Sequence, residues 1–157
     1  MKPPTSCELV VFVGLQGAGK STFYRTRFAA THVHVSKDLL RNARNKERRQ
    51  RELIAAALAE GLPVVVDNTN PAPEVRAPLV AIGRAAGVRV AAVFFDAPLR
   101  LCLARNAARE GRARVPDVAI HATRKRLVPP TPAEGFDEVL VVHVDPAHGT
   151  EIERLGM

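Results

Sequence analysis

The stretch Gly14–Ser21 constrains this chain most, because it reads G-x-x-x-x-G-K-S. Its glycines let the backbone turn tightly and approach a phosphate closely. Successive backbone N–H groups then form a concave anion site at the start of a helix. The apolar run Glu8–Val13 before it is typical of a buried strand, and Ser21–Ala30 after it has the composition of a helix. This context and spacing predict a phosphate-binding loop.

The side chains of this loop predict how a nucleoside triphosphate would be held. Lys20 supplies a mobile positive charge for the β- and γ-phosphates, and Ser21 supplies a hard oxygen for Mg²⁺. We expect ATP or another nucleoside triphosphate to bind the loop through Gly14, Gln16, Gly17, Ala18, Gly19, Lys20, Ser21 and Thr22.

Apolar strand-like runs alternate with helix-like segments along the chain. We expect strands at Glu8–Val13, His32–Ser36, Val64–Asp67, Val88–Phe95 and Val139–Val144. We expect helices at Ser21–Ala30, Asp38–Glu60, Glu74–Ala86, Pro98–Arg109 and Pro116–Val128, and a last short helix near Thr150–Leu155. Strands this apolar are typical of a parallel sheet covered by helices on both faces. The sequence therefore predicts an α/β P-loop fold, a three-layer sandwich with five parallel strands, in a single domain over residues 1–157.

Composition narrows the class of protein. The chain has 157 residues, of which 46% are hydrophobic, which suits a folded domain with a full core. No apolar run approaches a membrane span, and Met1–Ser6 is polar and proline-rich, so we expect a cytoplasmic protein without membrane contact. Cys7 and Cys102 form no close-spaced pair, which fits a reducing compartment. The net charge of +7 indicates polyanionic partners, although a bias toward Ala and Arg would also raise it.

Acidic residues lie at the carboxyl ends of the predicted strands, where parallel sheets bind their ligands. Asp67 is the candidate Walker-B-type acid for Mg²⁺, with a capping or loop role as the alternative. Asp96 holds a similar position, and sheet order decides which acid neighbours the loop. Asp38 and Arg41 are three residues apart, so on a helix they share a face. They could serve an attacking hydroxyl and an acceptor phosphate, or Asp38 could simply favour the helix dipole.

Two groups of arginines are candidates for anion binding. At helical spacing, Arg41, Arg44, Arg48 and Arg51 form either a solvated face or a track for a nucleic-acid backbone. Around Gly111, the chain carries Arg105, Arg109, Arg112 and Arg114, where a small kinase would have its mobile lid. Arg105 and Arg109 share a helix face and are favoured for contacts with the transferring phosphate. For His32 and His34 we expect a structural role rather than metal binding.

Several landmarks together resemble one family, the 5′-kinase domain of polynucleotide kinases. They are, in order, GLQGAGKSTF, VSKDLLR, VVVDNTN, ARNAAREGRARVP and PPTPAEGFDEV, and they extend over about Leu9–Val142. The resemblance implies transfer of the γ-phosphate of a nucleoside triphosphate to a 5′-hydroxyl end of DNA or RNA. It also implies a parallel sheet of order 2-3-1-4-5 and an arginine-rich lid.

The same resemblance implies a role for each matching residue. Lys20 would contact the transferring phosphates, Ser21 the metal, and Asp67 would support the metal site. Asp38 would be the general base toward the 5′-hydroxyl, and Arg41 would bind the phosphate next to the reacting nucleoside. The lid arginines would be Arg105 and Arg109.

Family members often carry fused phosphatase or ligase modules, and no stretch here fits one. The chain is then either a stand-alone kinase or one domain of a larger protein, with phosphatase or ligase repair proteins as expected partners. Two other functions stay open. One is a small-molecule kinase of the same fold, for which the D-x-x-R pattern at Asp38 and Arg41 is a poor match. The other is a nucleotide-binding regulatory ATPase without a productive acceptor.

Overall fold

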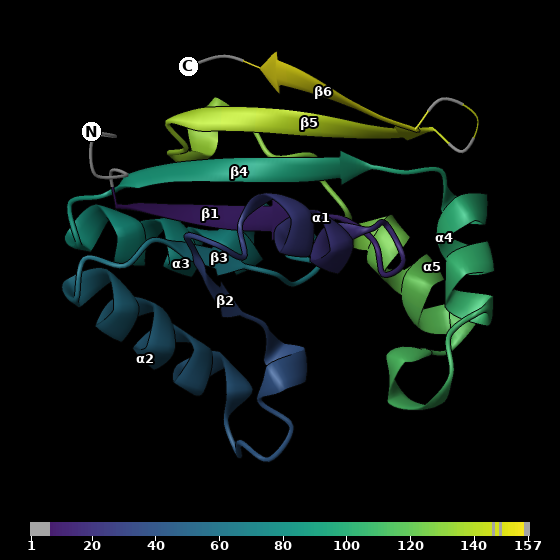
Figure 1. Ribbon diagram of the computed structural model, residues 1–157, viewed down its shortest axis with the longest axis horizontal. Coiled ribbons are helices and arrows are strands. Elements are labelled where there is room, and N and C mark those ends of the chain that lie inside the picture. Colours follow the sequence, from purple (N-terminus) through teal and green to yellow (C-terminus); the bar gives the residue numbers. More distant parts are fainter. Residues whose placement is uncertain (1–6, 146, 148, 156–157) are drawn as a thin grey trace.

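A computed structural model describes residues 7–145, 147 and 149–155. The first six residues, on which the expectation of no targeting segment depends, lie outside this range. The described residues form a sheet in the order β2-β3-β1-β4-β5-β6 (Figure 1). Five of its strands are parallel: β1 (Glu8–Val13), β2 (Val33–Val35), β3 (Val64–Val66), β4 (Arg89–Asp96) and β5 (Glu138–Asp145). The predicted parallel order 2-3-1-4-5 is confirmed.

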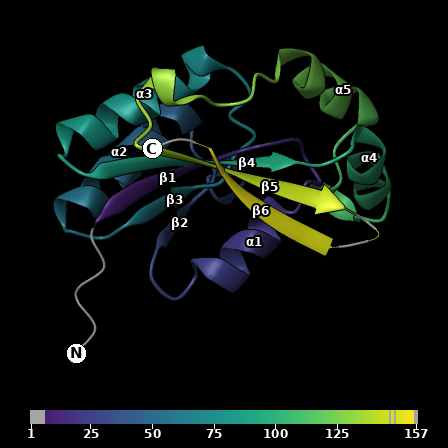
Figure 2. The ribbon, with the colours of Figure 1, turned by 90° about the horizontal axis from the view of Figure 1, so that it is seen from above.

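Helices cover both faces of the sheet, as predicted. They are α1 (Lys20–Arg27), α2 (Lys46–Ala59), α3 (Pro73–Ala85), α4 (Leu99–Ala107) and α5 (Asp117–Arg126). Figure 2 shows α3 on one side of the sheet and α1 on the other. In Figure 1, α4 and α5 lie beyond the carboxyl ends of β4 and β5. Among these described helices, none combines the length and apolar character needed to cross a bilayer.

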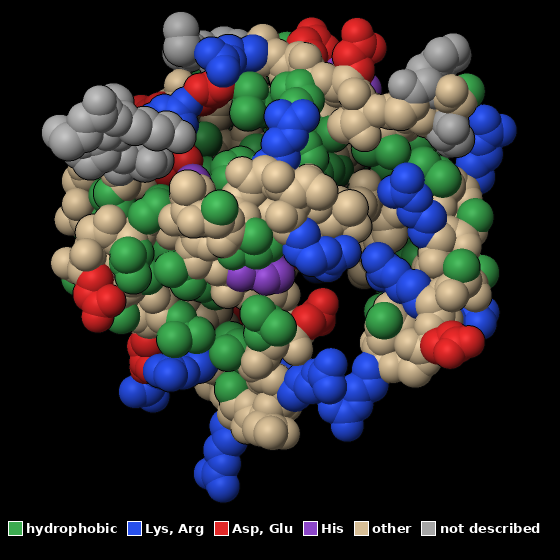
Figure 3. All heavy atoms as spheres, in the orientation of Figure 1, with side chains coloured by type: hydrophobic (Ala, Val, Ile, Leu, Met, Phe, Trp, Pro, Cys, Tyr) green, Lys and Arg blue, Asp and Glu red, His purple; other side chains and the backbone are tan. Residues whose placement is uncertain are grey.

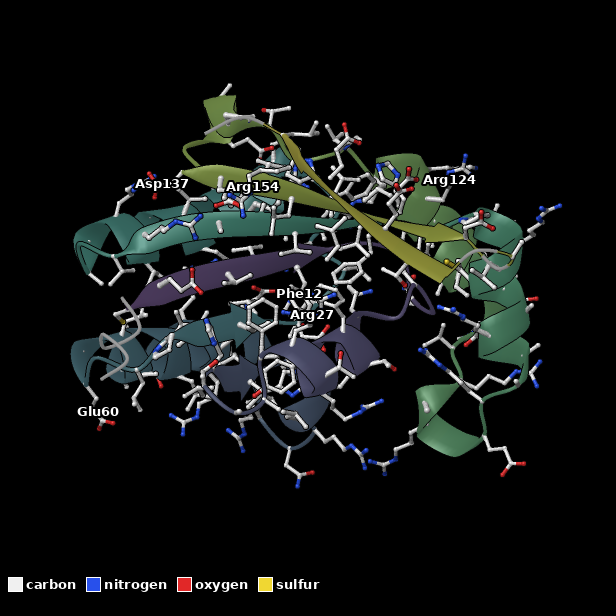
Figure 4. All side chains as sticks on the ribbon, turned by 45° about the horizontal axis from the view of Figure 1, so that its top comes forward. Phe12, Arg27, Glu60, Arg124, Asp137 and Arg154 are labelled. Atoms are coloured by element: carbon white, nitrogen blue, oxygen red, sulfur yellow. The ribbon has the colours of Figure 1, made fainter. Side chains whose placement is uncertain are left out.

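The alternating side chains of β1 build a separate core on each face. Leu9, Val11 and Val13 pack with residues of α2 and α3. On the other face, Phe12 is fully buried, and its ring lies 5.0 Å from that of Phe95 and 5.8 Å from that of Phe28. Figure 4 shows Phe12 between the sheet and α1. A strand buried on both faces needs apolar residues at successive positions, which is why Leu9–Val13 reads as one continuous apolar run.

The expectation of a helix near Thr150–Leu155 is wrong. The segment is a strand, β6 (Gly149–Leu155), which pairs antiparallel with β5 in a register that sets Ile152 opposite Val142. Every residue of β6 is exposed, so packing does not hold it against the core. The open edge of β5 offers unpaired backbone groups, and pairing with them overrides the local helix propensity of the Glu-Ile-Glu-Arg sequence.

The expected helix Asp38–Glu60 is also wrong in its first half. Lys37–Leu39 forms only a 3₁₀ turn, η1, and α2 begins at Lys46. The predicted cap at Ser36 does exist, since its side chain accepts from the backbone N–H of Asp38. A second cap, Asn45, accepts from the N–H of Arg48 and starts α2 anew. Arg41 and Arg44 therefore lie in a loop, and the predicted four-arginine stripe does not form.

An ion pair between Arg76 and Glu134 holds α3 to the segment before β5. Arg76 of α3 is fully buried, and its Nε and one terminal nitrogen lie 2.8 Å and 2.9 Å from the two carboxylate oxygens of Glu134. Its other terminal nitrogen donates to the carbonyl of Asn70 at 2.9 Å. Glu134 belongs to η3 (Pro132–Glu134), which also carries a capping box with Thr131. This bidentate pair joins α3 to the segment that leads into β5.

We predict that Arg76→Ala destabilises the protein by about 3–5 kcal/mol, because it leaves the partly buried Glu134 carboxylate without its partner. Arg84→Ala is a matched control on the same helix. Arg84 pairs with Asp137, and both side chains are more than 40% exposed, so that loss should cost about 1 kcal/mol or less. Urea denaturation of both variants measures the two costs. Equal costs would contradict the structural role of the Arg76 pair.

Candidate active site

The phosphate loop connects the end of β1 at Val13 with the start of α1 at Lys20. Gly17 and Gly19 have φ angles of 83° and 95°, in a region of backbone conformation that residues other than glycine rarely adopt. A Cβ atom on Gly17 would also lie 2.7 Å from the carbonyl oxygen of Cys102 in α4. The glycines are therefore required both by the turn itself and by the close approach of α4.

The other predicted loop residues have distinct surroundings. The side chain of Gln16 donates to the hydroxyl of Thr123 in α5 at 3.1 Å, so it faces α5. Ala18 is buried in the core, and the Thr22 hydroxyl accepts from Arg25 at 3.1 Å. Gln16 and Ala18 precede α1, and the backbone N–H of Ala18 donates to the carbonyl of Leu15 at 3.1 Å.

Lys20 is buried, and its ammonium donates to the carbonyl oxygens of Gly14 at 2.9 Å and Leu15 at 2.7 Å. The pKa of Lys20 is lowered to about 8: burial is the main cause and the charge of Arg109 acts in the same direction, whereas Asp67 and Asp38 oppose the shift. These three residues come from different elements of the fold. The structure thus places Asp67, Arg109 and Asp38 within electrostatic reach of one ammonium group.

Asp67 lies at the end of β3, directly beside the phosphate loop. Its Oδ2 accepts a 2.8 Å hydrogen bond from the Ser21 hydroxyl and lies 2.9 Å from Nε2 of His34. The His34 ring stacks on Tyr24, with centroids 4.0 Å apart. Asp96, the other candidate acid, is exposed and contacts His143 instead. Because β1 lies between β3 and β4, sheet order alone does not separate the two acids. The hydrogen bond from Ser21 selects Asp67 as the acid next to the loop.

Ser21 and Asp67 fit a Mg²⁺ site. Both offer hard oxygen ligands, which Mg²⁺ prefers, and the two atoms lie 2.8 Å apart. Mg²⁺ in nucleotide sites usually takes only one or two protein ligands and completes its shell with phosphate oxygens and water. Among the described residues, no group of three or more His, Cys, Asp and Glu side chains is placed to hold a metal ion by protein ligands alone.

Asp38 and Arg41 line a hollow of about 440 Å³ next to η1. The same hollow is lined by Leu39, Leu40, Asn42, Ala43 and, from α2, Arg49. Figure 3 shows a hollow on the face of Figure 1, bordered by Lys and Arg side chains with an acidic side chain at its edge. Sequence reasoning did not single out Arg49, because its place in the same hollow as Arg41 depends on the path of the loop before α2.

The lid arginines separate into two groups. Arg105 and Arg109 line a second hollow of about 410 Å³ with the phosphate-loop residues Gly17, Gly19 and Thr22. A terminal nitrogen of Arg105 lies 3.4 Å from the carbonyl of Gly17. Arg112 and Arg114, in and after η2 (Gly111–Ala113), are exposed and line neither hollow.

Asn106 closes the base of the lid. It is fully buried, its Nδ2 donates to the carbonyl of Val115 at 2.7 Å, and its Oδ1 accepts from the N–H of Val115 at 3.0 Å. This reciprocal pair joins the end of α4 to Val115, so the segment 107–114, where the lid is predicted, is held at both ends. The only sequence signal for this role is the position of Asn106 inside the R-N-x-x-R pattern.

A protein-family model described as an AAA domain matches residues 9–130. The chain belongs to this AAA domain family. A bifunctional polynucleotide phosphatase/kinase of Schizosaccharomyces pombe is 28% identical over 136 residues, which cover 84% of this chain and 32% of that protein. A putative bifunctional polynucleotide phosphatase/kinase of Acanthamoeba polyphaga mimivirus is 29% identical, over 88% of this chain and 34% of its own length. These relatives support the resemblance, and the chain spans about one third of their length.

Solved structures share the fold at low sequence identity. A chain of the Pnkp1/Rnl/Hen1 RNA repair complex matches with a TM-score of 0.65 and 23% identity, over 80% of this chain and 45% of its own. A sugar kinase from Janibacter sp. matches with a TM-score of 0.66 and 17% identity, over 88% and 85%. At such identities the likeness shows the kinase-like P-loop fold and leaves the acceptor open.

The lowered pKa of Lys20 predicts a pH-dependent stability. Below about pH 8 the folded protein carries the full cost of a buried charge. Between about pH 8 and the ordinary value of 10.5 the folded state has lost a proton that the unfolded state keeps, so stability rises with pH. The unfolding free energy of wild type relative to Lys20→Met should therefore rise by roughly 2 kcal/mol from about pH 7 to about pH 10. Urea titrations across this range measure the difference.

Lys20→Arg is the control, because a guanidinium group stays charged throughout. Its unfolding free energy relative to Lys20→Met should be constant with pH. A constant difference for wild type as well would show that Lys20 titrates normally.

Proposed function

We propose that this protein transfers the γ-phosphate of ATP, or of another nucleoside triphosphate, to 5′-hydroxyl ends of DNA or RNA. The observation that carries the proposal is the position of Asp38 and Arg41. They line a hollow that is distinct from the one at the phosphate loop, yet Asp38 acts electrostatically on Lys20. A phosphotransferase needs a donor site and a separate acceptor site that are close enough for the phosphate to pass from one to the other. The two polynucleotide phosphatase/kinase relatives favour a nucleic-acid end as the acceptor.

On the donor side, the loop N–H groups and Lys20 would hold the triphosphate. Arg105 and Arg109 would approach it from the lid, where they can stabilise charge on the transferring group. Ser21 and Asp67 would hold Mg²⁺, which supplies neutralisation of phosphate charge when it is bound. The hollow shared by the loop and the two arginines leaves room for the nucleotide.

On the acceptor side, the Asp38 carboxylate would orient the 5′-hydroxyl and accept its proton as the new P–O bond forms. Arg41 would bind the phosphate next to the reacting nucleoside. The exposed guanidinium of Arg49 lines the same hollow and adds positive charge for the acceptor strand. The hollow contains no aromatic side chain among its lining residues, so base stacking contributes little and the phosphates provide the main contacts.

The sugar kinase neighbour keeps a small-molecule acceptor as the second candidate, since its fold is equally similar. Transfer of labelled γ-phosphate to a 5′-hydroxyl oligonucleotide, beside a panel of sugars and nucleosides, separates the two. A third candidate, a regulatory ATPase, would hydrolyse ATP in this assay and phosphorylate none of these acceptors.

We further propose a repair role in the cytoplasm, with phosphatase or ligase proteins as partners. The support is the fold shared with a chain of the Pnkp1/Rnl/Hen1 RNA repair complex and the bifunctional nature of the two relatives. A kinase that produces 5′-phosphate ends supplies the substrate that a ligation step consumes.

We expect Asp38→Asn to lower the transfer rate by about 10²–10⁴-fold, because an amide cannot accept the proton of the hydroxyl. ATP affinity, measured by calorimetry, should change little, since Asp38 lines a hollow apart from the phosphate loop. If the variant transfers phosphate at the wild-type rate, Asp38 has only a structural role, and Asp67 becomes the next candidate for the base.

We expect Arg109→Lys to have much lower activity than wild type, because an ammonium group cannot reproduce the planar, bidentate contacts of a guanidinium. Arg114→Ala is the control, since Arg114 is exposed and lines neither hollow. Steady-state kinetics should show a loss of about 10²-fold or more for the first variant and little change for the second. Small, equal effects would mean that the lid arginines are wrongly assigned.

A further inference from the structure

The segment Asp67–Asn70, between β3 and α3, is bound firmly to the strand and loop that carry the phosphate site. The carbonyl of Thr69 accepts from the N–H of Gly14 at 3.0 Å. The side chain of Asn70 donates to the carbonyl of Phe12 at 2.8 Å. Asn70 itself has a φ of 42°, which asparagine adopts more readily than most residues, and the buried Arg76 holds its carbonyl. The donor side of the site is thus anchored to this segment.

One side chain of the same segment, Asn68, reaches the acceptor side. Its Oδ1 accepts from the backbone N–H of Lys37 at 2.9 Å. Its Nδ2 donates to Oε1 of Gln50, a buried residue of α2, at 2.6 Å. A single carboxamide therefore connects the end of β3 with η1, which carries Asp38, and with the helix that follows.

The turn η1 has few other supports. It is three residues long, none of them is buried, and the side chain of Leu39 is 63% exposed. Short 3₁₀ turns have poor hydrogen-bond geometry and little stability of their own. In the ion pair of Lys37 with Glu47 the two side chains are 31% and 52% exposed, and ion pairs this accessible to solvent contribute little. Hydrogen bonds to Asn68 and to the capping Ser36 must therefore set the position of Asp38.

We infer that Asn68 is a positioning residue, which fixes Asp38 relative to the phosphate loop. The inference rests on the proposed function, in which Asp38 serves the attacking hydroxyl. In-line transfer requires the two sides of the site to be aligned, and a displacement of about 1 Å can cost about 10²-fold in rate. The Asp67–Asn70 segment provides this alignment because it contacts both sides directly.

The test is Asn68→Ala, assayed by transfer to a 5′-hydroxyl oligonucleotide. We expect kcat to fall by about 10- to 100-fold, with the calorimetric affinity for ATP changed less than about twofold. Asn68→Asp should recover most of the rate, because a carboxylate still accepts from the N–H of Lys37 and the Gln50 amide can rotate to donate to it. Arg84→Ala, at an exposed residue of α3 that pairs with Asp137 and lines neither hollow, should leave kcat unchanged.

A double-mutant cycle distinguishes positioning from general destabilisation. If Asn68 acts through Asp38, Asn68→Ala should lower kcat by less than about threefold in an Asp38→Asn background. Losses that multiply in the double variant, or failure of Asn68→Asp to recover activity, would overturn the inference.

Amide hydrogen exchange separates this inference from the proposed function. Asn68→Ala should speed exchange at the Lys37 amide by at least about tenfold while the amides of β1 stay protected. If wild type fails to phosphorylate oligonucleotides, the proposed function is wrong whatever the exchange result. If wild type is active and the Lys37 amide stays protected in the variant, the positioning role is wrong and the function stands.

Discussion

The site depends first on the parallel pairing of β1 with β3, which sets Val11 opposite Val66. Because the two strands run in the same direction, the phosphate loop that follows β1 and the acid that follows β3 emerge at one edge of the sheet. This brings the hydroxyl of Ser21 within 2.8 Å of the Asp67 carboxylate, although 46 residues separate them in the chain. Pairing of β2 with β3 brings η1 and Asp38 to the same edge.

Side-chain hydrogen bonds add to apolar packing in holding the parts of the site together. Leu15 and Ala18 anchor the phosphate loop in the core, whereas η1 has no buried side chain. Three asparagines contact β1 just before the loop, η1, and the segment that follows α4. Asn70 binds the carbonyl of Phe12, Asn68 binds the N–H of Lys37, and Asn106 binds both backbone groups of Val115. A carboxamide can donate and accept at once, so one side chain can join two backbone segments at a fixed distance. Such loops stay close to the surface, where ligands reach them, and still keep defined positions.

Burial of the Lys20 ammonium group destabilises its charged form but also holds the side chain in place. Lys20 is held in a buried position by two carbonyls, and its pKa falls to about 8 because the surroundings disfavour its charge. A bound triphosphate would favour the charged form, so the penalty in the free protein would be offset on binding. The carbonyls of Gly14 and Leu15, in the loop just after β1, already restrict the lysine side chain, which limits the entropy it would lose when a ligand binds.

The sequence by itself determined the five parallel strands, the phosphate loop and the candidates Asp38, Arg41, Asp67, Arg105 and Arg109. Glycine spacing, apolar runs and strand-end acids are local features, and local features can be read from the chain. Only the tertiary structure decided that Thr150–Leu155 is a strand, that the helix after Asp38 starts late, and that Arg49 lines the same hollow as Asp38 and Arg41. It also gave roles to Asn68, Asn106 and Arg76, whose partners lie on other elements. The physical reason is that edge-strand pairing and side-chain hydrogen bonds between distant segments leave no periodic mark in the sequence.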